Sequence, residues 1–256
     1  MIRHSFQHDG LTLSYLDAAG DGLVLIALHA HLMEALTFAP LAAALAPNWR
    51  VIALDQRGHG HSDHAPTYTR NDYLGDIAAL YHHLRLEAAV LLGNSLGGAN
   101  AYQFAARHPE LVRAMVIEDI GAVVADDTSF VLDWGGTFAT REALEERIGP
   151  RFAPYFVDSF RHTLDGWTLA FDPRDMVASQ GQLNGDHWDD WLASTCPALL
   201  VRGRDSKVTS AEQFEDMAAR RPDTALVTLA GGHVVHADNP AGFAQAVKTY
   251  LQRLEV

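Results

Sequence analysis

A glycine-rich turn at residues 93–98 (GNSLGG) constrains the fold of this chain more than any other feature. It lies between the apolar run Ala88–Leu92 and the segment Ala99–Arg107, which has helical composition. A serine at a tight strand-to-helix turn, with small residues two positions before and after it, forms the nucleophile-elbow pattern. A side chain at Gly93 or Gly97 would collide with its neighbours in such a strained turn. The pattern predicts a strand, an exposed serine hydroxyl and a helix, in that order.

Apolar runs and helical patterns alternate along most of the chain. The predicted strands are Leu11–Leu16, Val24–Leu28, Val51–Leu54, Val90–Leu92, Ala114–Ile117, Ala198–Arg202 and Ala225–Leu229. The predicted helices are Leu41–Leu45, Asn71–Leu84, Ala99–Arg107, Ala211–Arg220 and Ala241–Leu254, and Thr69 with Asp72 is a candidate cap of the second. This alternation predicts an α/β fold with a mostly parallel sheet and helices on both faces. Ligands on such sheets bind at the carboxyl ends of the strands.

The alternation stops between about residues 122 and 192, where no buried strand is evident. This stretch holds eleven of the 23 aromatic residues, interspersed with acidic side chains. We expect a single domain over residues 1–256, with a core of residues 1–121 and 193–256 and an inserted helical lid at about 122–192. The lid would line an apolar pocket over the strand ends. In the alternative interpretation, the aromatic side chains only attach the insertion to the body.

Charge and hydropathy narrow the range of partners. The formal net charge is −13, and a field of that sign repels nucleic acid and anionic membranes. No run of eighteen apolar residues is present, and the first residues do not have the shape of a signal peptide. We therefore expect no nucleic-acid or membrane partner and, by default, a cytoplasmic location; the small-molecule substrate is expected from the catalytic residues discussed below.

The serine of the turn, Ser95, needs a base to become a nucleophile, and the base is most often a histidine oriented by a carboxylate. His233 follows two glycines and the last predicted strand, so its loop reaches the strand ends, and we favour it over His236. Asp119 and Asp205 each follow a predicted strand. Either one is able to deliver a carboxylate to the same imidazole.

The histidine-rich stretch 59–64 (HGHSDH) matches the spacing of a dinuclear zinc signature. Such a site requires further ligands on a different fold. The preceding residues 55–58 (DQRG) instead resemble a loop of the α/β-hydrolase family, and this resemblance implies no metal. Asp55, Arg57 and His59 are expected to brace this loop near the serine turn.

Four stretches together resemble the α/β-hydrolase family. They are the serine turn, residues 54–63 (LDQRGHGHSD), Leu28-His29 after an early strand, and His233–Pro240 near the end. The resemblance covers nearly the whole chain and implies a three-layer α/β-hydrolase fold. The resemblance also bears on which carboxylate orients the histidine. Arg202–Ser206 is similar to the R-G-x-x-S loop of those members whose catalytic acid follows the strand before this loop's own strand. That comparison favours Asp119 over Asp205.

The oxyanion hole of such a fold comes from two backbone amides. We expect these to be the N–H groups of Leu96 and His31. Family members usually have glycine where this chain has Ala30. Asn94 stands where many relatives have histidine.

These residues predict a serine hydrolase that cleaves carboxylic esters through an acyl-enzyme, without cofactor or metal. Its substrates are expected to be small and apolar or aromatic. The expected pocket residues are His29, Asn94, Trp134, Phe138 and Trp167. The alternatives are hydrolysis of a lactone, thioester, amide or carbon–carbon bond by the same three residues, and a ligand-binding protein without activity.

Overall fold

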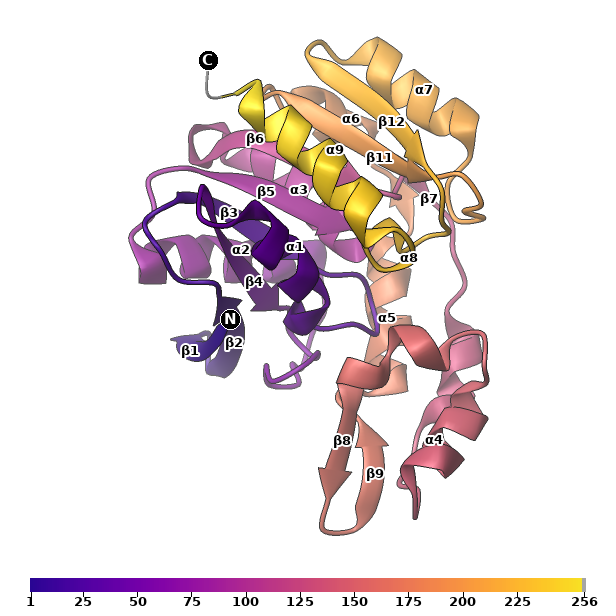
Figure 1. Ribbon diagram of the computed structural model, residues 1–256. Coiled ribbons are helices and arrows are strands. Elements are labelled where there is room, and N and C mark those ends of the chain that lie inside the picture. Colours follow the sequence, from indigo (N-terminus) through magenta and orange to yellow (C-terminus); the bar gives the residue numbers. More distant parts are fainter. Residues whose placement is uncertain (255–256) are drawn as a thin grey trace.

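The computed structural model describes residues 1–254, which fold around an eight-stranded sheet (Figure 1). In spatial order the strands are β1 (Ile2–His8), β2 (Leu11–Asp17), β4 (Trp49–Asp55), β3 (Leu23–Leu28), β5 (Ala89–Asn94), β6 (Val112–Glu118), β11 (Ala198–Gly203) and β12 (Thr224–Leu229). β2 is antiparallel to both of its neighbours, and all other pairs are parallel. This arrangement confirms the predicted mostly parallel sheet.

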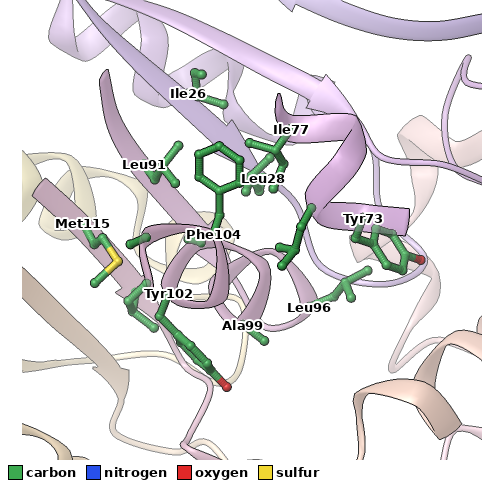
Figure 2. Packing of buried hydrophobic residues seen from close by; sticks show 14 of the residues in the cluster. Ile26, Leu28, Tyr73, Ile77, Leu91, Leu96, Ala99, Tyr102, Phe104 and Met115 are labelled. Carbon is green, nitrogen blue, oxygen red and sulfur yellow. The ribbon is translucent and has the colours of Figure 1, made fainter. Parts of the chain in front are cut away.

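Helices cover both faces of the sheet and produce three layers. One face carries α1 (Ala39–Leu45) and α9 (Pro240–Gln252), and the other carries α2 (Arg70–Leu84), α3 (Leu96–Arg107), α6 (Trp188–Ala193) and α7 (Ala211–Arg220). Side chains alternate between the faces of a strand, so the central strands contribute to two cores. In β3, Ile26 and Leu28 face the second set of helices. Figure 2 shows them beside Phe104 of α3.

Local sequence signals explain most of the element boundaries. Thr69 and Asp72 form the predicted capping box of α2. Helix α3 begins at Leu96, three residues earlier than predicted, because it starts directly after the serine turn. β1 was not predicted. It is an edge strand whose residues are mostly exposed, with only Phe6 buried, and it therefore lacks an apolar run.

The inserted segment, residues 122–192, adds no strand to the eight-stranded sheet. Its helices are η3 (Ser129–Trp134), α4 (Arg141–Ile148), η4 (Ala153–Tyr155), η5 (Val157–Ser159), α5 (Pro173–Leu183) and α6. Two short antiparallel ribbons accompany these helices, and the expected helical insertion did not include them. β7 (Val123–Val124) pairs with β10 (Gly185–Asp186), and β8 (Phe160–Thr163) pairs with β9 (Gly166–Leu169). Figure 1 shows α4, β8 and β9 standing clear of the sheet.

The inserted segment has a hydrophobic cluster of its own. It includes Trp134, Leu144, Phe160 and Met176 from the segment, together with Ala30, Leu32 and Met33 from the loop after β3. The two ends of the segment instead pack on the sheet, through Ala122, Val124, Leu183 and Trp191. No helix of residues 1–254 is both long and apolar enough to cross a membrane.

Candidate active site

Ser95 lies in the strained turn between β5 and α3. Its backbone has φ 52° and ψ −117°, a conformation that non-glycine residues adopt only where surrounding contacts impose it. A Cβ at Gly93 would overlap the carbonyl of Gly97, and a Cβ at Gly97 would overlap the carbonyl of Leu28. The close approach of α3 to the strand ends therefore depends on both glycines.

His233 follows β12, and its Nδ1 lies 2.7 Å from Oδ2 of Asp119. Asp119 follows β6 and is fully buried. Its carboxylate also accepts the N–H of Gly203 at 3.1 Å and the hydroxyl of Ser206. Three donors thus converge on one carboxylate, which fixes the orientation of the His233 ring through its Nδ1.

The structure does not bring the carboxylate of Asp205 to His233. Asp205 is exposed, and its backbone N–H donates to the carbonyl of Gly231 at 2.9 Å. Ser206, one residue later, points inward and donates to Asp119. Sequence reasoning did not identify Ser206 as a site residue. The signal was present, because Ser206 is the serine of the R-G-x-x-S loop.

His236 does not pair with Asp119 but forms a second, buried pair with Glu118. Its Nδ1 lies 2.8 Å from Oε2 of Glu118, its N–H donates to Oε1 at 2.8 Å, and its Nε2 lies 2.7 Å from Oγ1 of Thr37. Both side chains are almost completely buried. This pair anchors the loop that carries His233 to the end of β6.

Two predicted pocket residues, Asn94 and His29, are buried beneath the site and do not line its cavity. Nδ2 of Asn94 donates to the carbonyls of His233 at 3.1 Å and of Glu118 at 3.2 Å. His29 Nδ1 donates to the carbonyl of Ala30 at 2.7 Å, and its Nε2 accepts the N–H of Gln56 at 3.0 Å. Their contacts position the surrounding backbone, which corrects the pocket prediction for both.

A cavity of about 410 Å³ opens between the sheet and the inserted segment, and Ser95 and His233 both line it. Its aromatic walls are Phe130, Phe152, Tyr155 and Phe156, and its charged lining consists of Asp126, Asp127, Arg151, Asp205 and Lys207. Burial raises the pKa of Asp126, and the nearby His233 opposes this shift.

Trp134, Phe138 and Trp167 were predicted to line this cavity, and the structure places all three elsewhere. The ring of Trp134 packs behind those of Phe130, Phe152 and Phe156, with centroid distances of 5.5, 5.6 and 5.8 Å. It lines a separate cavity of about 690 Å³. Phe138 and Trp167 pair through their backbones, N–H to carbonyl, at 2.7 and 2.8 Å.

The two expected oxyanion amides lie close to this cavity. Leu96 is the first residue of α3, where an N–H has no intrahelical acceptor. In the described part of the chain, no backbone or side-chain acceptor takes the N–H of His31, which lines the cavity. Burial lowers the pKa of the His31 imidazole to about 3, and the positive charge of Arg70 adds to the shift. The imidazole is therefore neutral at physiological pH.

The side chains of residues 59–64 that have hydrogen-bond partners bind different groups. His59 Nδ1 lies 2.9 Å from the carbonyl of Arg57, Asp63 accepts the N–H of Thr12 at 2.7 Å, and His64 pairs with Asp175 at 3.0 Å. Over residues 1–254, no group of three or more His, Cys, Asp or Glu side chains is arranged to hold a metal ion.

Comparison with known proteins identifies the family. A 2-(acetamidomethylene)succinate hydrolase from Mesorhizobium japonicum is 30% identical over 247 residues, 91% of this chain and 89% of that protein. A pimeloyl-(acyl-carrier protein) methyl ester esterase from Xanthomonas campestris is 27% identical, covering 94% of this chain and 99% of that protein. The crystal structure of an E-2-(acetamidomethylene)succinate hydrolase matches with a TM-score of 0.88 at 27% identity, over 98% of this chain and 99% of that one. The model of the alpha/beta hydrolase family matches residues 23–246, and the chain therefore belongs to that family.

Proposed function

We propose that this protein is a serine hydrolase that cleaves carboxylic esters of small apolar or aromatic compounds through an acyl-enzyme. One observation carries the proposal. Ser95 and His233 line the same cavity, and His233 is hydrogen-bonded to the buried carboxylate of Asp119. This arrangement supports a nucleophile, a base and an acid that orients the base.

In the proposed reaction, Nε2 of His233 accepts the proton of the Ser95 hydroxyl while the oxygen attacks the carbonyl carbon. The N–H groups of Leu96 and His31 stabilise the oxyanion, and each such donor contributes about 3 kcal/mol. His233 then gives its proton to the leaving alcohol. A water molecule, activated by the same imidazole, hydrolyses the acyl-enzyme and restores Ser95.

The cavity supports a small substrate with an apolar or aromatic part. Its volume of about 410 Å³ lies toward the lower end of the range for small-molecule sites, and aromatic rings form much of its wall. An esterase is among the similar proteins. In this proposal the inserted segment acts as the lid of the site.

A second candidate is the hydrolysis of an acyl compound that carries a carboxylate, including an amide. The name of the Mesorhizobium relative specifies a succinate derivative with an acetamido group. Arg151 and Lys207 line the cavity here and supply cationic groups for such a carboxylate. The three aspartates of the same cavity oppose it.

Fluorophosphonate labelling and ester turnover test the proposal together. We expect the protein to be labelled, and Ser95→Ala to abolish labelling and lower kcat about a millionfold. Ser194→Ala, a buried serine outside the site, is the matched control and should label normally. Labelling of Ser95→Ala would contradict the proposal, and no labelling of the unmodified protein would favour a ligand-binding role. Faster cleavage of monoesters of dicarboxylic acids than of neutral esters would favour the second candidate.

A further inference from the structure

We propose that the inserted segment is part of the catalytic apparatus, because two of its buried serines, Ser159 and Ser179, hold the oxyanion loop in position. The oxyanion loop is defined here as residues 29–33, which follow β3 and include the N–H of His31. This inference rests on the proposed function, since the direction of that N–H matters only if an oxyanion forms beside it.

Ser179, on α5, fixes the side chain of His31. Its Oγ lies 2.7 Å from Nε2 of His31 and 2.8 Å from the hydroxyl of Tyr73 on α2. Ser179 is fully buried, and His31 and Tyr73 are nearly so. Because the His31 imidazole is neutral, these bonds form a short chain of uncharged donors and acceptors. The chain links the oxyanion loop to Ser179 of the inserted segment and, through Ser179, to Tyr73 of the main domain.

Ser159, at the end of η5, holds the next residue of the loop. Its hydroxyl donates to the carbonyl of Leu32 at 3.0 Å, and the serine is 1% exposed. Leu32 has φ 70°, which lies in the left-handed region that residues other than glycine rarely adopt. Such a conformation persists only where neighbouring contacts impose it. The Ser159 bond is one of those contacts, and it acts on the residue directly after the proposed oxyanion donor.

Apolar and ionic contacts connect the same loop to the inserted segment. Leu32 and Met33 belong to the hydrophobic cluster of the segment and not to either core of the sheet. One residue beyond the loop, the buried carboxylate of Glu34 pairs with Arg161 of β8. On the sheet side, Nε2 of Gln56 donates to the carbonyl of His29 at 2.6 Å. The loop is thus held by the sheet at its first residue and by the inserted segment over the rest.

The test compares Ser159→Ala and Ser179→Ala with the unmodified protein. Phenylboronic acid is the probe, because its boron accepts the Ser95 oxygen to form a tetrahedral adduct while the hydroxyl proton passes to His233. One oxygen of that adduct takes the place of the oxyanion. We expect kcat for a p-nitrophenyl ester to fall about 10- to 100-fold in each variant, less than the loss of a whole oxyanion donor. KM should change less than threefold, and the inhibition constant of phenylboronic acid should rise in parallel with the fall in kcat.

Ser194→Ala is the matched control. Ser194 is also 1% exposed, and its hydroxyl donates to a backbone carbonyl, that of Trp191, at 2.7 Å. It makes no contact with the oxyanion loop, so its loss should lower the unfolding temperature without changing kcat or the boronic acid affinity. If Ser194→Ala lowers kcat as much as the other two variants, the effect is one of general stability and the inference is wrong.

Two further results separate this inference from the proposed function. If turnover depends on Ser95 but both serine variants keep normal kcat and boronic acid affinity, only this inference fails. If the unmodified protein shows no turnover that depends on Ser95, the proposed function fails and this inference with it. Should Ser179→Ala not fold, Tyr73→Phe removes the outer hydroxyl of the same chain. It is expected to lower kcat several-fold, and an unchanged kcat would contradict the inference that this chain of hydrogen bonds holds His31 in position.

Discussion

Nδ2 of Asn94 donates a hydrogen bond to the backbone carbonyl of His233 at 3.1 Å, so the residue next to the candidate nucleophile holds the loop of the candidate base. Asn94 is fully buried, and the same amide group also reaches the carbonyl of Glu118. The spacing between Ser95 and His233 is therefore set partly by a direct link between β5 and the loop after β12.

Substituting Asn94 tests this link. Asn94→Ala removes the side-chain donor to the carbonyl of His233, whereas the carbonyl of Glu118 keeps the backbone N–H of Ser95 at 3.0 Å. A buried polar group left without a partner costs about 1–3 kcal/mol. We expect lower stability and a fall in kcat of about 10-fold or more, measured by urea denaturation and by ester turnover. Asn71→Ala, at an exposed position that accepts a bond from Arg107, should have little effect on either. A normal kcat in folded Asn94→Ala would show that the loop keeps its place without this bond.

The identity of the acid is tested by two parallel substitutions. In Asp119→Asn, an amide replaces the carboxylate that faces Nδ1 of His233 and no longer favours the required tautomer. We expect kcat to fall on the order of ten-thousandfold. Asp205→Asn should change kcat by only a few-fold, because this side chain is exposed and makes no bond to His233. The opposite ranking would assign the acid to Asp205.

The turn itself is tested at Gly97. A Cβ at this position would overlap the backbone carbonyl of Leu28, which is unable to move without distorting β3. We expect Gly97→Ala to unfold at a much lower temperature and to lose fluorophosphonate labelling. Gly181→Ala is the control, since a Cβ there meets nothing within 4 Å in α5 and should add up to about 1 kcal/mol of stability. Normal melting and labelling of Gly97→Ala would contradict the close approach described here.

Three buried histidines predict a loss of stability in acid. Burial lowers the pKa of His29, His31 and His59 below the ordinary value, in His31 to about 3. The unfolded chain binds these protons near pH 6.5, whereas the native state does not. The free energy of unfolding is therefore highest above about pH 6.5 and falls as the pH decreases, by up to about 1.4 kcal/mol per pH unit for each histidine.

His59→Asn isolates one of these contributions. Its amide is able to replace the Nδ1 donor to the carbonyl of Arg57, and it has no proton to gain in the unfolded state. Urea denaturation from pH 8 to pH 4.5 should give a shallower pH dependence than that of the unmodified protein. At pH 8, where the histidine is neutral in both states, the difference in free energy of unfolding between the two proteins measures the cost of the substitution itself. Parallel curves would show that His59 does not contribute.

The sequence was sufficient to predict the sheet because its central strands are short apolar runs with helical patterns between them. β1 escaped prediction because an exposed edge strand has no such run, and its residues Ile2–His8 alternate irregularly between polar and apolar. The two ribbons of the inserted segment were missed for a similar reason. Strands of two to four residues contain too few side chains to establish a period.

Motif order allowed Ser95, His233 and Asp119 to be proposed, but it did not show which way the surrounding side chains point. Asn94 and His29 lie beside the site in sequence and beneath it in space. Trp134 was expected in the cavity because it lies in a stretch rich in aromatic residues. In the structure, Phe130 and Phe152 line the cavity and Trp134 packs behind them. An aromatic stretch without a regular period does not reveal which rings form the surface and which form the support.

The buried hydroxyls of Ser159 and Ser179 have a consequence for engineering this scaffold. Grafting residues 122–192 from a relative would be the obvious way to transplant its preference for a substrate. Such a chimera would acquire new side chains around the cavity. It would also lose the hydrogen bonds of Ser159 and Ser179 to Leu32 and His31. A donor segment would therefore have to carry equivalent hydroxyls at both places, whatever rings it brought to the cavity.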